Sequence, residues 1–142
     1  MEALEHATVT AKDELSTLYA RPSEGVLRKE IDHVDGVGRA FIAASPFLIL
    51  ATGSRRGLDC SPKGDKPGFV HVEDDGRTLL IPDRRGNDRI DSLKNLVEDP
   101  RIGLIFLIPG ATRPIGLTAG PGSAPIQSSS GVLLSTARSP RR

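Results

Sequence analysis

Three arginines and an asparagine gather just where a helix is expected to begin. They are Arg84, Arg85, Asn87 and Arg89, and the helix is expected over about residues 88–97. Each cation at a helix N-terminus opposes the macrodipole by about 0.3–1 kcal/mol. A phosphate at that point would accept bonds from free backbone N–H groups and bidentate bonds from arginine. The pattern predicts an anion site, and the alternative is a solvated loop whose charge is balanced by neighbouring aspartates.

A second candidate group ends an expected strand over residues 58–63. Ser61 and Lys63 combine a hydroxyl donor with a cation, and a bound anion could join them to the arginines. The alternative is an exposed strand end, because lysine usually faces solvent. The one cysteine, Cys60, is expected to pack as a small apolar residue.

Other catalytic chemistry finds little support in the sequence. The three histidines, His6, His33 and His71, are scattered and show no metal-ligand spacing. The sequence contains no G-x-S-x-G, C-x-x-C or H-E-x-x-H motif, and Gly36-Val37-Gly38 is too short for a dinucleotide fingerprint. We therefore expect no metal site and leave the catalytic residues unknown.

Apolar periodicity and turn residues give the expected order of elements. Helices are expected over residues 13–19, from a Ser23 cap through Val34, and over 37–44. Strands are expected over residues 47–52, 58–63, 69–72, 78–81 and 102–108, with the helix over 88–97 between the last two. Its inward face should carry Ile90, Leu93, Leu96 and Val97. This order predicts an α+β fold with a small antiparallel barrel.

Charge and composition narrow the possible partners. Residues 1–110 carry 15 Lys and Arg against 18 Asp and Glu, which argues against a nucleic-acid partner. No apolar run approaches the roughly 20 residues of a membrane span, and no signal peptide is visible. A single cysteine excludes an internal disulfide, so a cytoplasmic setting is expected.

The chain changes character after Gly110. Residues 111–142 hold four arginines, no acidic residue and many Gly, Pro and Ser, which is typical of disorder. The expected organisation is an N-terminal extension over residues 1–22, a domain over 23–110, and a mostly disordered tail over 111–142.

Four segments between about Tyr19 and Gly110 carry a resemblance to a known family. They read RPSEGVLRKEIDHVD, RAFIAASPFLILAT, DCSPKGDKPGFV and LLIPDRRGNDRIDSLKNLVEDPRIGLIFLIPG. Together they resemble the pyridoxamine 5′-phosphate oxidase-like proteins, the FMN-binding split-barrel family. The last segment is the longest and the most specific.

The resemblance implies an antiparallel split barrel that forms a homodimer and holds FMN between the subunits. Family members bind the FMN phosphate from a strand end and from the start of the next helix. In this sequence those positions correspond to Ser61 and Lys63, and to Arg84, Asn87 and Arg89. Groups near Pro82 and Asp83 would lie beside the flavin ring.

The resemblance is expected to stop near Gly110, where the basic tail begins. Family members usually continue into further strands, so the barrel is expected to be incomplete at the C-terminus, with an open edge. A shifted reading frame or a truncated gene would produce such a junction, and a natural divergent end is the alternative.

The leading functional hypothesis is an FMN-dependent oxidoreductase acting on a small-molecule substrate. The alternatives are a non-catalytic flavin, haem or deazaflavin carrier, and an inactive truncated fragment. Whether the chain is an enzyme is left open by the residues themselves.

Overall fold

The computed structural model describes residues 8–27, 31–84, 89–119 and 132–135. The chain divides into two compact units, Met1–Glu30 and Ile31–Arg142. The first unit contains helices α1 (Lys12–Leu18) and α2 (Glu24–Leu27), and no residue of α1 is buried. In the described ranges, no helix has the length and apolar character that crossing a membrane requires.

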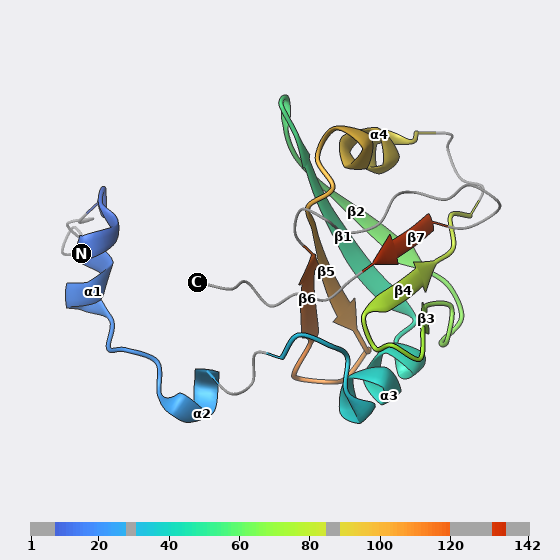
Figure 1. The fold of residues 1–142 in the computed structure, drawn as a ribbon, viewed down its shortest axis with the longest axis horizontal. Helices are drawn as coiled ribbons and strands as arrows, with labels where there is room; N and C mark the ends of the chain where they lie inside the picture. Colours follow the sequence, from blue (N-terminus) through green and yellow to red (C-terminus); the bar gives the residue numbers. More distant parts are fainter. Residues whose placement is uncertain (1–7, 28–30, 85–88, 120–131, 136–142) are drawn as a thin grey trace, which may run out of the picture. The chain divides into compact units, whose positions relative to one another are not determined.

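The second unit contains two antiparallel sheets (Figure 1). The larger sheet has the order β2-β1-β5-β6, with strands β1 (Phe47–Ser54), β2 (Gly57–Gly64), β5 (Ile102–Leu107) and β6 (Ile115–Ala119). The smaller sheet has the order β3-β4-β7, with strands β3 (His71–Val72), β4 (Thr78–Ile81) and β7 (Val132–Ser135). Helix α3 (Gly36–Ala44) precedes β1, and α4 (Asp91–Glu98) lies between β4 and β5 in the chain and contacts β1 and β2.

The core lies where alternate residues of both sheets meet the two helices. Leu48 and Leu50 of β1 are buried with Leu104 and Phe106 of β5, because paired residues of neighbouring strands point to the same face. Val72, Leu79 and Ile81 contribute from the smaller sheet, and Ile42 and Leu96 from the helices. Fully burying a side chain such as Phe106 contributes about 1.5–3 kcal/mol.

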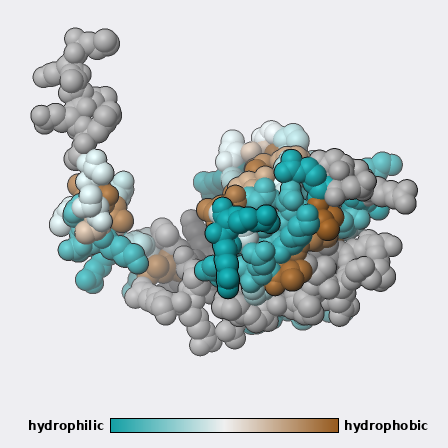
Figure 2. Space-filling view, turned by 90° about the horizontal axis from the view of Figure 1, so that it is seen from above, coloured by the Kyte–Doolittle hydropathy of each residue, from teal (hydrophilic) through white to brown (hydrophobic). Residues whose placement is uncertain are grey.

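The opposite face of the larger sheet is also apolar, but it is half-buried or exposed. Ile49 pairs with Pro62 on one side and with Ile105 on the other, so these three side chains form a row across three strands. The neighbouring rows are equally uncharged and consist of Phe47, Ala51, Leu58, Cys60, Gly64, Gly103 and Leu107. In the view of Figure 2, hydrophilic residues cover much of the described surface, with smaller hydrophobic patches between them.

The expected α+β fold is confirmed, and its strands fall close to the predicted ranges. The helix expected from Ser23 through Val34 is wrong in its second half, since residues 31–35 are not helical. Val34 donates its N–H to Gly76 O (2.7 Å), and Asp35 Oδ1 accepts from the Gly38 N–H (2.8 Å) as the N-cap of α3. The helix expected over 37–44 thus begins at Gly36, with Asp35 as its N-cap.

Two segments of the expected tail form strands. Residues 115–119 pair with β5, and residues 132–135 pair with β4 along Thr78–Ile81. The disorder expected for these nine residues is wrong, because neighbouring strands supply the hydrogen-bond partners that their own composition does not encode. The open edge expected beside β5 is covered by β6.

Candidate functional site

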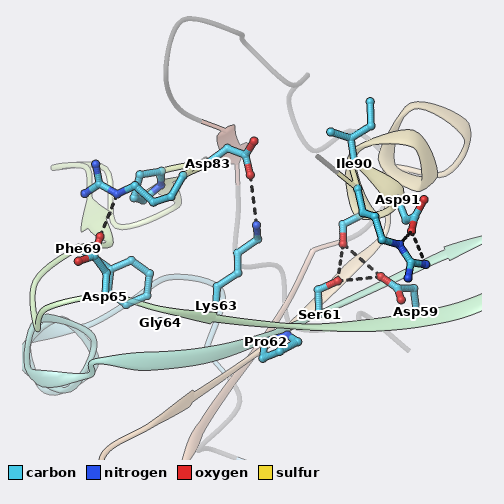
Figure 3. Close-up of a pocket in the computed structure, with 14 residues that line it drawn as sticks. Asp59, Ser61, Pro62, Lys63, Gly64, Asp65, Phe69, Asp83, Ile90 and Asp91 are labelled. Atoms are coloured by element: carbon cyan, nitrogen blue, oxygen red, sulfur yellow. Dashed lines mark hydrogen bonds and ion pairs between the residues drawn. The ribbon is translucent and has the colours of Figure 1, made fainter. Parts of the chain in front are cut away.

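A cavity of about 710 Å³ opens beside the edge strand β2 (Figure 3). Its walls come from β2 and the turn that follows, from the end of β4, and from the start of α4. The lining residues are Asp59, Ser61, Pro62, Lys63, Gly64, Asp65, Phe69, Pro82, Asp83, Arg84, Arg89, Ile90, Asp91 and Ser92.

Strand alternation places three polar side chains of β2 at this cavity. Asp59, Ser61 and Lys63 occupy alternate positions and are half-buried, whereas their neighbours Leu58, Cys60 and Pro62 are exposed on the apolar sheet face. Ser61 pairs with Leu50 of β1, so it shares the core side of the sheet. Because β2 is the edge of the sheet, its core-side residues border solvent.

The N-terminus of α4 adds free backbone donors and a hydroxyl to the cavity. The N–H groups of a first helical turn have no intrahelical acceptor, and Ile90, Asp91 and Ser92 line the cavity at that turn. Ser92 is buried, and its Oγ lies 2.8 Å from Ser61 Oγ. Asp59 Oδ2 accepts from Ser61 Oγ at 2.9 Å and from Ser92 Oγ at 3.2 Å.

Each cation of the cavity faces a carboxylate. Lys63 Nζ lies 3.3 Å from Asp83 Oδ1, which joins β2 to the end of β4, and Figure 3 shows this side chain reaching across to Asp83. Arg84 Nε donates to Asp65 Oδ2 at 2.9 Å. Arg89 Nε donates to Asp91 Oδ2 at 2.9 Å.

The pKa of the Asp65 carboxyl is lowered by two hydrogen bonds. The backbone N–H of Lys66 donates to Asp65 Oδ1 at 2.8 Å and is the larger cause of a lowered pKa. The Arg84 guanidinium on the other oxygen lowers the pKa of the same carboxyl further. Asp65 therefore stays ionised and keeps Arg84 turned toward the turn after β2.

Six of the seven residues predicted to hold a cofactor line this one cavity. They are Ser61, Lys63, Pro82, Asp83, Arg84 and Arg89. The seventh, Asn87, lies outside the described residues, and so does Arg85 of the same predicted cluster. Segments 20 to 30 residues apart in the sequence thus meet at a single site.

Four polar members of the lining were not among the predicted site residues: Asp59, Asp65, Asp91 and Ser92. The signal for Asp59 was its alternation with Ser61 and Lys63, which places all three on one face of the strand. Ser92 was hidden because the expected inward face of α4 was wrong in part: Ile90 is 47 % exposed and Val97 is 79 % exposed. The helix instead buries Ser92, Asn95 and Leu96.

The position of Cys60 also differs from expectation, since it is exposed rather than packed. It lies on the apolar sheet face, away from Ser61. In the part of the chain that the structure describes, no group of three His, Cys, Asp or Glu side chains is arranged to hold a metal ion.

A family model described as pyridoxamine 5′-phosphate oxidase matches residues 34–135, which is more than half of the sequence. The chain belongs to this family. The match continues past Gly110, so the expectation that the resemblance ends there is wrong. It ends at the last residue of β7, so both of the strands found beyond Gly110 lie within it.

A solved structure supports the same fold. A HupZ variant from Group A Streptococcus has a TM-score of 0.52 and 13 % sequence identity, over 74 % of this chain and 96 % of that one. Among curated proteins, none matches the chain. The family match and this structural likeness together establish an α+β split barrel of the pyridoxamine 5′-phosphate oxidase type.

Proposed function

We propose that the cavity beside β2 binds FMN and that the protein is an FMN-dependent oxidoreductase acting on a small molecule. The observation that carries the proposal is the meeting of Lys63, Arg84 and Arg89 with Ser61 and Ser92 around one cavity. A phosphate group accepts hydrogen bonds only, and all five side chains can donate. The first turn of α4 adds backbone donors of the same kind.

The dimensions and the donor set fit a flavin mononucleotide. The cavity volume of about 710 Å³ falls within the roughly 300–1,000 Å³ of small-molecule sites. Phe69, Ile90 and the two prolines add apolar surface to a polar end. In this arrangement the phosphate replaces carboxylates as the partner of the cations, and Pro82 and Asp83 lie beside the ring.

The flavin supplies the hydride or electron transfer when it is bound. The chain's own residues hold and orient it: Lys63, Arg84 and Arg89 neutralise the phosphate charge, and Ser61 and Ser92 donate hydrogen bonds. Asn87 follows Arg84 in the connection to α4 and is proposed to add a further amide donor.

A flavin suits this cavity better than haem does. Haem iron is held by His, Cys, Met or Tyr. None of these types occurs among the described residues that line the cavity, whereas its cations and hydroxyls suit phosphate.

A non-catalytic flavin carrier is the second candidate. The observation that favours it is the set of ionisable lining residues, which among the described ones are only Asp, Lys and Arg. Side chains that commonly move protons near neutral pH, such as His, are not among them. Reduction of the bound flavin and its reoxidation by a substrate or oxygen, followed near 450 nm, distinguishes an enzyme from a carrier.

The binding proposal is tested by replacing Arg84 and Arg89 with Ala together. Loss of two charge-assisted hydrogen bonds, at about 1.5–3 kcal/mol each, should weaken FMN binding by about 3 kcal/mol or more, which is over a hundredfold. A matched control replaces Arg55 and Arg56 in the β1–β2 turn, which removes the same charge from exposed positions outside the cavity lining. Unchanged FMN affinity in the first variant would refute the phosphate assignment.

We also propose a homodimer that covers the apolar sheet face. Family membership supports this, and so does the run of uncharged side chains around Ile49 and Ile105 on the strands of the larger sheet. A cytoplasmic location is part of the same proposal, supported by a sequence whose one cysteine cannot form an internal disulfide.

A further inference from the structure

We infer that the Asp59 carboxylate is an internal competitor of the phosphate group and sets how strongly the cavity prefers a phosphorylated ligand. The inference rests on the proposed function, because it concerns the same cavity. It assigns to Asp59 a role opposite to that of the cations around it.

The contacts of Asp59 carry the inference. Its Oδ2 atom is 2.9 Å from Ser61 Oγ and 3.2 Å from Ser92 Oγ, while the two hydroxyl oxygens are 2.8 Å apart. Each hydroxyl has one proton to donate. Asp59 is therefore placed to receive the very protons that Ser61 and Ser92 would offer to a phosphate.

Asp59 differs in this from the other carboxylates of the cavity. Asp65, Asp83 and Asp91 each lie against a lysine or arginine side chain. Asp59 instead accepts from two neutral hydroxyls, that of Ser61 on its own strand and that of Ser92 on α4, and Figure 3 shows it beside Ser61 at the start of α4.

Phosphate entry then has a definite cost. When Ser61 and Ser92 turn their protons to the phosphate, Asp59 loses both hydrogen bonds and keeps its charge. Two like charges then lie close together in a half-buried site, where repulsion is less screened than in water. Asparagine at this position keeps the shape of the side chain and removes the charge, so it should strengthen the binding of a phosphorylated ligand.

The test compares FMN with riboflavin, which has the same ring and no phosphate. Dissociation constants are measured by flavin fluorescence for the wild-type protein, for Asp59→Asn and for Glu98→Gln. Glu98 is exposed at the far end of α4 and supplies a control with the same change of charge. We expect Asp59→Asn to bind FMN about tenfold more tightly and riboflavin equally well, and Glu98→Gln to change neither.

A second comparison asks whether Asp59 acts through the hydroxyls. In a Ser61→Ala/Ser92→Ala background the gain in FMN affinity from Asp59→Asn should shrink, since there are no hydroxyl protons to compete for. Circular dichroism verifies that each variant is folded.

The outcomes separate the two claims. The competitor role of Asp59 is refuted, and the flavin site stays in place, if wild-type protein binds FMN while Asp59→Asn lowers the FMN affinity. The same holds if Asp59→Asn changes the affinities for FMN and riboflavin by the same factor. The competitor role is also refuted if Asp59→Asn raises FMN affinity as much in the Ser61→Ala/Ser92→Ala background as in the wild type. If folded wild-type protein binds neither flavin, the proposed function fails and this inference fails with it.

Discussion

At the scale of single residues, the site is a set of cations that carboxylates hold in place. Arg84 is fixed by Asp65 and Lys63 by Asp83, so the guanidinium and ammonium groups stay near the cavity. Asp83 and Arg84 are exposed, while Lys63 and Asp65 are half-buried. Ion pairs that border solvent in this way contribute little to folding stability. Their main consequence is therefore positional.

The pKa of Asp65 should report on Arg84. In Arg84→Ala that pKa should rise, but it should remain below the ordinary value of 3.8, because the Lys66 N–H is the larger cause of its depression. A lowered carboxyl pKa adds stability above pH 3.8, and this is lost as pH falls through the folded-state pKa. Arg84→Ala should therefore lose part of the contribution that the lowered Asp65 pKa makes to the free energy of unfolding above pH 3.8. Carbon-detected NMR titration of the carboxyl measures the shift, and an unchanged value would show that the ion pair does not form in solution.

A buried hydrogen bond holds α4 over the larger sheet. Asn95 Nδ2 donates to Thr52 Oγ1 at 3.1 Å, and both residues are buried. Asn95→Ala should lower the free energy of unfolding by about 1–3 kcal/mol, because a buried hydroxyl loses its partner. Urea denaturation measures this. The double variant Asn95→Leu/Thr52→Val, which removes both polar groups, should recover much of the loss, and no recovery would count against the hydrogen bond as the cause.

At the scale of elements, the side chain of Arg39 anchors α3 to the smaller sheet. Arg39 donates from Nη1 to Val72 O (2.8 Å) and from Nη2 to Glu73 O (2.6 Å) and Asp74 O (3.2 Å). The guanidinium thus caps the carbonyls at the end of β3 and in the turn that follows. Gly76 in the same turn has φ +65°, a conformation that glycine adopts readily.

Arg39→Met should destabilise the protein by about 2–3 kcal/mol, since its apolar stem is kept but three carbonyls lose a charged donor. The stability of Arg39→Lys, which keeps one donor group, should lie between the stabilities of Arg39→Met and the wild type. Thermal or urea unfolding measures both. Equal stability of Arg39→Met and wild type would contradict the anchoring role.

Strands β1, β4 and β5 were predictable because they are short apolar runs. Residues 78–81 match β4 at both ends, and the predicted strand over 47–52 lies within β1. The sequence and the family resemblance together named Ser61 and Lys63 of β2 and four residues after β4, all of which line the one cavity.

What could not be predicted depends on tertiary contacts. The inward face of α4 is set by Asn95 meeting Thr52 and by Ser92 meeting Ser61, two polar contacts that an apolar stripe does not reveal. Strands β6 and β7 have weak local signals and are recognised only through the partners they pair with. Asp59 was missed because a carboxylate repels an anion and is therefore not expected in an anion site.

At the scale of the whole molecule, the apolar sheet face of the larger sheet is a candidate interface. A second copy of the chain would bury Ile49, Ile105 and their neighbours. Ile105 is 44 % exposed, so a charge there should be tolerated in the monomer and not in a dimer.

Wild-type protein should therefore sediment as a dimer and Ile105→Glu as a folded monomer. Val97→Glu, an exposed apolar position on α4, serves as the matched control and should remain dimeric. Sedimentation velocity with circular dichroism decides this. A wild-type monomer, or a dimer unaffected by Ile105→Glu, would show that this face is not the interface.

The central claim is that a flavin phosphate is held between the edge strand and the start of α4. A crystal structure of the protein grown with FMN tests it directly. We expect the phosphate within hydrogen-bond distance of Ser61 or Lys63 on one side and of Arg84 or Arg89 on the other. A flavin bound elsewhere, with these side chains still paired to their aspartates, would contradict the account.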